Sequence, residues 1–372
     1  MRTLSTSVRL RFNPCSAVRL FKTSFCLQEV SPLAIRPQPF VKWPCPNNKP
    51  KRKPRRLGGG GIADGKELRM RAVWSFWSRP FHTYYGRIWC NPLHHLLAWG
   101  LSLHAASRHY PDTVLITDRP GKKLLIEQLR LPFANVSTEL ERLDGADPGW
   151  WALGKLVAYS LQDQPFVHLD SDVFLWKRLP PHLLNSPVFT QYPEGFYDND
   201  PHYRPQDIEW AFGQQSTRLP LEWERARANR SHFPAENCGI LGGSNVEFLC
   251  FYSQTAVDLI LRPENAAAWS RLHDKRCYNV VVEQFFLSAC AEFHAGGESP
   301  FGNVRISRLF AGWEDAFNPT HAARVGFTHL VSGAKSHPGV GRRLEERVRR
   351  ENPAYFRRCQ QVLAKSDRLL SA

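Results

Sequence analysis

Two aspartates, Asp170 and Asp172, interrupt an otherwise apolar run, FVHLDSDVFLW, that extends from Phe166 to Trp176. The run predicts a buried strand that ends on the two carboxylates. Mg²⁺ and Mn²⁺ prefer oxygen ligands and are commonly held by one or two carboxylates together with substrate phosphates. Carboxylates at a buried strand end also need a cation or hydrogen-bond donors to offset their lost solvation. The motif therefore predicts a divalent metal site, whereas the alternative is an acidic pair that merely ends a strand.

A histidine, a glycine and a lysine follow a later predicted strand in the segment THLVSGAK, residues 328–335. His329 offers a third metal ligand, and Lys335 offers a mobile positive charge for a diphosphate. Gly333 lets the backbone approach a ligand closely. The alternative is a core histidine beside a solvated lysine, and the acidic motif favours the functional interpretation.

Two further segments combine polar groups with apolar surroundings. In ENCGILGG, residues 236–243, Gly239 permits close backbone approach, and the amide of Asn237 can bind sugar hydroxyls. Glu283 and Gln284 lie in a predicted helix over residues 279–293, between valines and phenylalanines. We interpret both segments as substrate-facing, and the alternatives are tight strand packing and a satisfied buried network.

Strands and helices alternate from Met70 onward. Strands are predicted at 72–77, 113–117, 134–138, from Phe166, and at 187–192, 305–309 and 327–330. Helices are predicted at 93–109, 122–131, 149–161, 206–214, 246–261, 279–293, 342–350 and 353–364, whereas 193–202 is expected to be a loop and 219–232 irregular. This order predicts an α/β domain with a mainly parallel sheet and helices on both faces. Ligands bind beyond the carboxyl ends of such strands, where Asp118 also falls, so Asp118 joins the candidate substrate-binding residues.

The first 69 residues differ from the rest in composition. They contain fifteen Lys and Arg against three Asp and Glu, a net charge of +12 out of +15, with proline clusters and four consecutive glycines. We expect a disordered extension followed by one domain over 70–368. Because Met1 and Met70 are the only methionines, we also expect translation of a bacterial gene to start at Met70, which intact mass would test. The basic run over residues 49–56 has an alternative interpretation as a nucleic-acid-binding tail. Such runs are usually only solvated, so we expect no nucleic-acid partner.

Cysteine usage and hydropathy bear on the compartment. The nine cysteines form no CxxC pair, which argues against a zinc site and favours a reducing compartment. No apolar run approaches the ~20 residues that span a bilayer. The expected location is cytoplasmic, and the basic C-terminal helices are either solvated or in weak contact with an anionic membrane surface.

The motifs, in this order, resemble those of GT-A-fold glycosyltransferases, most closely the group related to glycogenin and the lipopolysaccharide galactosyltransferases. The opening MRAVWSFWSRPF also resembles an uncharacterised bacterial family in that superfamily. The resemblance implies a single Rossmann-type domain that uses Mn²⁺ or Mg²⁺ to move a sugar from a nucleotide-diphosphate sugar to a hydroxyl of a carbohydrate, glycolipid or protein. It implies metal binding by Asp170, Asp172 and His329. It further implies donor contacts by Lys155 and Lys335, and sugar or acceptor contacts by Asn237, Glu283 and Gln284.

Two other functions remain open from the sequence. The first strand carries Trp74, Phe76 and Trp77 where the group has an Asn-Asp-type loop, which leaves open a carbohydrate- or nucleotide-binding module without turnover. A phosphatase of the haloacid dehalogenase type also has a DxD motif after an apolar strand. That family carries the motif on its first strand and needs a later acidic pair, for which Glu314 and Asp315 are the nearest candidates.

Overall fold

A central sheet of seven strands organises the residues that the computed structural model describes, which are 70–83, 88–228, 230–296 and 299–370. The expected N-terminal extension lies outside these residues. The strand order is β10-β6-β9-β4-β1-β2-β3. Strand β9 is antiparallel to both of its neighbours, and the other pairs are parallel. The strands are β1 (Arg71–Phe76), β2 (Thr113–Thr117), β3 (Asn135–Ser137), β4 (Phe166–Leu169), β6 (Val188–Thr190), β9 (Ile240–Gly243) and β10 (Ile306–Arg308).

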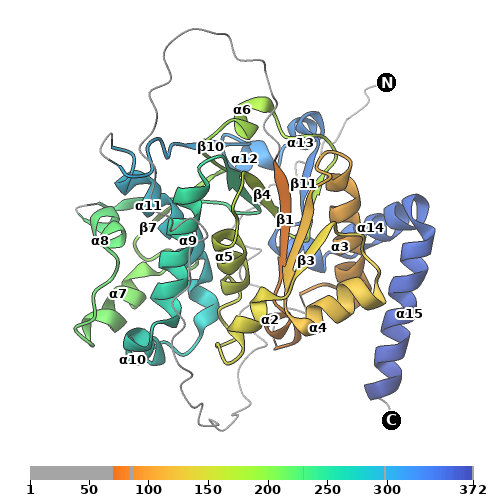
Figure 1. The fold of residues 1–372 in the computed structure, drawn as a ribbon, viewed down its shortest axis with the longest axis horizontal. Coiled ribbons are helices and arrows are strands. Elements are labelled where there is room, and N and C mark those ends of the chain that lie inside the picture. Colours follow the sequence, from red (N-terminus) through yellow and green to blue (C-terminus); the bar gives the residue numbers. More distant parts are fainter. Residues whose placement is uncertain (1–69, 84–87, 229, 297–298, 371–372) are drawn as a thin grey trace, which may run out of the picture. The chain divides into compact units, whose positions relative to one another are not determined.

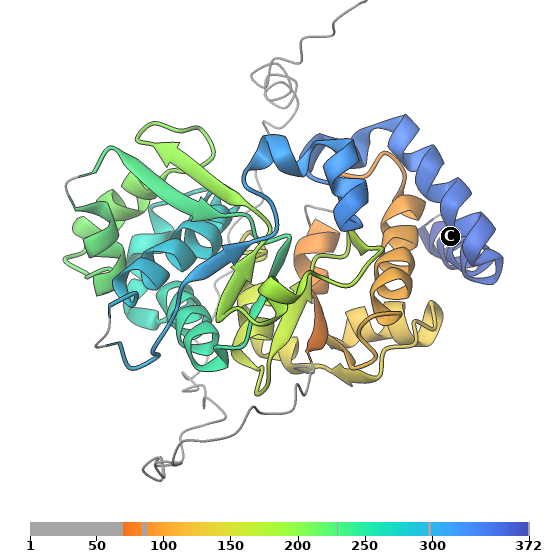
Figure 2. The ribbon, with the colours of Figure 1, turned by 90° about the horizontal axis from the view of Figure 1, so that it is seen from above.

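Helices cover both faces of the sheet (Figures 1 and 2). Successive side chains of a strand point to opposite faces, and in β1 Val73 belongs to one apolar core while Trp74 belongs to the other. The Val73 face packs against α5 (Leu153–Ser160), α9 (Val246–Leu261) and α11 (Phe286–Phe293). The Trp74 face packs against α3 (Pro92–Ser107), α14 (Pro338–Glu351) and α15 (Pro353–Leu370). The predicted α/β class with a mainly parallel sheet is confirmed.

A small two-stranded sheet connects the C-terminal part of the chain to the acidic motif. Strand β5 (Val173–Leu175) pairs antiparallel with β11 (Phe327–His329), and Val173 lies opposite His329. The backbone N–H of Leu330 donates to the carbonyl of Asp172 at 3.0 Å. This pairing brings two segments that are over 150 residues apart in sequence to the same edge of the sheet.

Two expectations about the middle of the chain were wrong. The expected loop over 193–202 begins with a strand, β7 (Pro193–Tyr197), which pairs with β8 (His232–Glu236). The expected irregular segment over 219–232 contains a helix, α8 (Leu221–Arg227), which buries Trp223 and Ala226. Both elements depend on partners distant in sequence, which override local composition.

The expected helix over 279–293 consists of a π-helical segment, Val281–Phe285, followed by α11. Such segments are rare and often occur at functional sites. The other short helices are α2 (Ser78–Thr83), α4 (Arg119–Lys122), α6 (Pro181–Leu184), α7 (Pro205–Gly213), α10 (Ala266–Ser270), α12 (Trp313–Ala316) and α13 (Pro319–Val325). Among the described helices, none is both long and apolar enough to cross a bilayer.

Candidate active site

Asp170, Asp172 and His329 lie together just beyond the carboxyl end of β4. Each offers one ligand atom, and these atoms lie within 4.8 Å of one another. Two ligands of one cation are at most about 4.4 Å apart when each bond is about 2.2 Å long. The Nε2 atom of His329 is 3.7 Å from Oδ1 of Asp172, a spacing that one cation can bridge. With a slight closure, the three side chains suit a divalent cation.

The position and tautomer of His329 are determined by its neighbours. Its Nδ1 atom is 2.8 Å from Oε1 of Gln191. Because an amide oxygen only accepts hydrogen bonds, Nδ1 carries the proton and Nε2 keeps a lone pair for a cation. Burial lowers the pKa of His329, although Asp172 and Asp170 oppose the shift, so the ring is neutral at neutral pH. Gly239 leaves the space for this pair, since a Cβ there would lie 2.3 Å from Oε1 of Gln191 and 2.4 Å from the imidazole ring.

Two lysines form ion pairs with the carboxylates. The Nζ atom of Lys155, on α5, is 3.0 Å from Oδ1 of Asp170 and 2.8 Å from Oε1 of the fully buried Glu283. Burial alone would lower the pKa of Lys155, but the carboxylates of Asp170 and Glu283 outweigh it and raise the pKa. The Nζ atom of Lys335 is 2.5 Å from Oδ2 of Asp172. Both lysines therefore contact the acidic motif itself.

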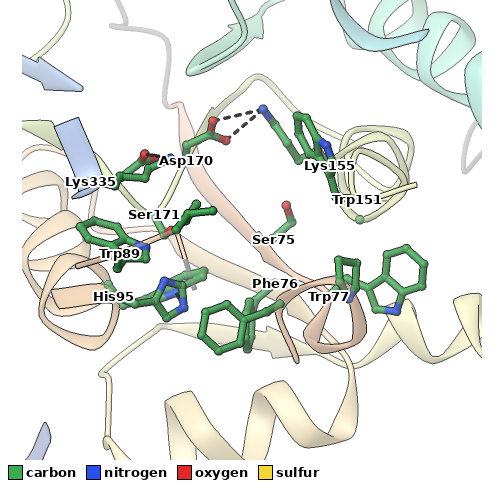
Figure 3. Close-up of a pocket in the computed structure, with 16 residues that line it drawn as sticks. Ser75, Phe76, Trp77, Trp89, His95, Trp151, Lys155, Asp170, Ser171 and Lys335 are labelled. Atoms are coloured by element: carbon green, nitrogen blue, oxygen red, sulfur yellow. Dashed lines mark hydrogen bonds and ion pairs between the residues drawn. The ribbon is translucent and has the colours of Figure 1, made fainter. Parts of the chain in front are cut away.

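A cavity of about 290 Å³ lies beside the acidic motif (Figure 3). Lys155, Asp170, Asp172 and Lys335 line its polar side. Burial and nearby Lys335 lower the pKa of His95 to about 3, so this wall residue is a neutral ring. The aromatic residues of the lining are Phe76, Trp77, Phe81, Trp89, His95, Trp99 and Trp151. The combination suits a flat apolar ring at one end of a ligand and an anionic group at the other.

The sequence from residue 70 to residue 362 matches a protein-family model that is described as a family of unknown function, DUF6734. The chain belongs to this family. No curated protein matches it.

Among solved structures, the galactosyltransferase LgtC in complex with donor and acceptor sugar analogs is 12% identical over 74% of this chain and 96% of its own, with a TM-score of 0.31. Mouse xyloside xylosyltransferase 1 in its apo form is 11% identical over 70% of this chain and 96% of its own, with a TM-score of 0.32. At these identities and TM-scores, neither structure indicates what the site of this chain binds.

In this DUF6734 protein, Asn237 and Gln284 lie in a second polar cluster. The Nδ2 atom of Asn237 donates to Oε1 of Glu194 at 2.7 Å. The hydroxyl of Tyr203 lies between the other oxygen of Glu194 and the amide oxygen of Gln284. Burial and Glu194 raise the pKa of Tyr203 well above its ordinary value, so it remains a neutral phenol. The cluster adjoins the acidic motif through Cys238, whose carbonyl oxygen accepts a hydrogen bond from Lys155 at 3.1 Å.

Two predicted substrate-binding residues lie elsewhere in the DUF6734 protein. Asp118 is buried and accepts hydrogen bonds from the backbone N–H and hydroxyl of Ser78 and from the N–H of Gly121. These contacts cap α4 and fix the start of α2. Gly333 lies in the 3₁₀ turn Ser332–Ser336 with open space around its Cα. Neither residue lines the cavity beside the acidic motif, and their roles in ligand binding stay predictions.

Proposed function

We propose that this protein is a metal-dependent glycosyltransferase of the GT-A type, which moves a sugar from a nucleotide-diphosphate sugar to a hydroxyl acceptor. The observation that carries the proposal is the convergence of Asp170, Asp172 and His329 beside a cavity with an aromatic wall and two lysines. Metal ligands, phosphate-binding charges and a base-sized apolar wall are the three parts that such a donor requires.

In this proposal, Asp170, Asp172 and His329 hold Mn²⁺ or Mg²⁺. The neutral imidazole with a free Nε2, fixed by Gln191, supports the assignment of His329 as a ligand. The cation supplies positive charge against the donor diphosphate when it is bound. Lys335 adds charge to the departing diphosphate, and Lys155 holds Asp170 in place.

The donor base stacks on the aromatic wall of the cavity, because rings of this kind bind a planar base with little dependence on its identity. The acceptor approaches from the opposite side of the metal site. A second cavity, of about 380 Å³, supports this, because it is lined by Trp176, Gln191, Phe317 and His329. Asn237, Glu283 and Gln284 face the transferred sugar or support the groups that do, with Glu194 as their partner.

A thermal-shift screen of the full chain tests the proposal. Nucleoside diphosphates and their sugars are tested with and without Mn²⁺, on wild type and on the double variant Asp170→Asn, Asp172→Asn. We expect one nucleotide to raise the Tm only in the presence of metal, and the double variant to lose the effect. The matched control is Asp144→Asn, because Asp144 is exposed and lies outside the cavity. This variant should keep the metal-dependent rise in Tm of the wild type. Metal-dependent stabilisation that survives in the double variant contradicts the proposal.

The screen also separates the other functions considered from the sequence. Metal-dependent nucleotide-sugar binding without transfer to any hydroxyl acceptor identifies a binding module. A phosphatase of the haloacid dehalogenase type is disfavoured because three strands precede the motif. Its candidate acidic pair is also displaced: Asp315 accepts a hydrogen bond from the N–H of Ala311 and pairs with His321, outside the cavity.

A further inference from the structure

A cysteine, a histidine and a glutamate form a chain of contacts outside the metal site. The Sγ atom of Cys90 is 3.2 Å from Nδ1 of His94, and Nε2 of His94 is 2.7 Å from Oε1 of Glu345. Cys90 is exposed, whereas His94 is buried. Cys90 precedes the N-cap of α3, His94 lies in the first turn of that helix, and Glu345 comes from α14.

The geometry determines which ring nitrogen of His94 carries a proton. An ionised carboxylate only accepts hydrogen bonds, so Nε2 of His94 carries a proton and donates a hydrogen bond to Glu345. Nδ1 is then free to take the proton of the Cys90 thiol. Because the two ring nitrogens face different partners, the arrangement is a proton relay and not a chelate for a metal ion.

The surrounding structure supports this arrangement. Gly341 of α14 lies against the His94 ring, where a Cβ would come within 2.2 Å of Cε1. Any other residue would push the ring from its place between Cys90 and Glu345. Cys90 also lies two residues before Pro92, the first residue of the 16-residue helix α3, so the backbone that carries the thiol is continuous with the helix that carries His94.

We propose that Cys90, His94 and Glu345 form an activated-thiol site that undergoes exchange with small disulfides. The Cys90 thiol gives its proton to Nδ1 of His94, and the resulting thiolate attacks one sulfur of the disulfide. The Cys90–sulfur bond forms as the disulfide bond breaks, and the leaving thiolate takes up a proton from His94 or from water. A reducing thiol reverses the reaction.

Acyl transfer is a poorer match for the same three side chains. The backbone N–H groups of Cys90 and Leu93 already donate to the carbonyl of Lys335 and to the side chain of Asn91. Neither is available to bind an oxyanion, which acyl transfer requires. Disulfide exchange needs no such donor. The contact with Lys335 also puts Cys90 next to the proposed donor site. Its nearness to a donor site rests on the proposed function, whereas the exchange reaction does not.

Cys277 is the internal reference for the test, because it is also exposed. Partial burial and Asp274 raise the pKa of Cys277, and no histidine hydrogen-bonds to it among the described contacts. The full chain is incubated with oxidised glutathione, and mixed disulfides at each cysteine are followed by peptide mass spectrometry. We expect Cys90 to react at least about tenfold faster than Cys277 at neutral pH.

Two variants test the relay. Glu345→Gln should slow the reaction of Cys90 with oxidised glutathione by about three- to tenfold and leave the rate at Cys277 unchanged. A neutral amide can still orient the imidazole, but it does not stabilise the positive charge of the protonated ring. Glu346→Gln, an exposed neighbour on the same helix, is the matched control and should react as wild type. The proposal is overturned if Cys90 reacts with oxidised glutathione no faster than Cys277. It is also overturned if Glu345→Gln folds normally and leaves the reaction rate of Cys90 unchanged. Thiol exchange requires no nucleotide or metal, so its failure and that of the glycosyltransferase assignment are independent.

Discussion

Replacing Gly239 by alanine tests whether His329 is a metal ligand without altering any charged group. The new Cβ would lie 2.3 Å from Oε1 of Gln191 and 2.4 Å from Cε1 and Nδ1 of His329, whereas ordinary contacts begin at 3.4 Å. The backbone at Gly239 is fixed, because its carbonyl accepts the N–H of Asp170 at 3.1 Å. The histidine and the glutamine must therefore retreat by about 1 Å.

A displacement of about 1 Å exceeds the tolerance of metal-ligand distances, which is about 0.2 Å. We expect Gly239→Ala to lower the affinity for Mn²⁺ by about 10- to 100-fold. This is the typical loss when a group that orients a metal ligand is removed. Overpacking of this kind costs about 1–3 kcal/mol of the free energy of unfolding. The variant should therefore fold but bind metal poorly.

Isothermal titration with Mn²⁺ measures the effect, and urea unfolding without metal measures stability. Gly213→Ala, at the end of α7, is the matched control, since its Cβ would also enter open space, and it should bind Mn²⁺ as wild type does. If Gly239→Ala binds Mn²⁺ with unchanged affinity, His329 is not a ligand and the metal site proposed here is wrong.

Two further predictions concern buried titratable groups. Lys155→Met leaves Glu283 buried without a cation and should lower the free energy of unfolding by about 3–5 kcal/mol; urea unfolding should show a smaller loss when Glu283→Gln is added to the same chain. The pKa of His95 is about 3 in the folded protein, below its ordinary value of 6.5. Between these two pH values the unfolded chain binds a proton that the folded chain does not, so the free energy of unfolding falls as the pH drops through that window. From about pH 7.5 to about pH 5 the expected loss is about 2 kcal/mol, and it should disappear in His95→Phe.

The acidic edge of the site could be predicted from the sequence because it follows from strand ends. An apolar run that ends on Asp170 and Asp172 needs partners, and a histidine at the end of a later strand is one of few candidates. The pairing of β5 with β11 brings His329 to that edge. Lys335 follows in the same segment, so the sequence also indicated a cation nearby.

Other parts of the site could not be predicted because no local pattern marks them. Gln191 and Glu194 are single polar residues, and only the pairing of β7 with β8 brings Glu194 to Asn237. Composition around Pro193, with its glycine and acidic neighbours, favours a loop, and the partner strand outweighs it. The aromatic wall combines residues from four separate segments between 76 and 151, each of which is indistinguishable in sequence from ordinary core.

The charges at the site predict that the proposed binding of metal is linked to the proposed binding of a diphosphate. Asp170, Asp172 and Glu283 face Lys155 and Lys335, so the group carries a net charge of −1 while His329 is neutral. Lys335 is engaged by Asp172 at 2.5 Å and is not free to bind a phosphate in this arrangement. In the proposed function, a divalent cation held by Asp172 would neutralise this carboxylate in place of Lys335, and the Lys335 side chain would then be available to a diphosphate. If both ligands bind as proposed, each prepares the site for the other, and by linkage the two affinities must rise by the same factor.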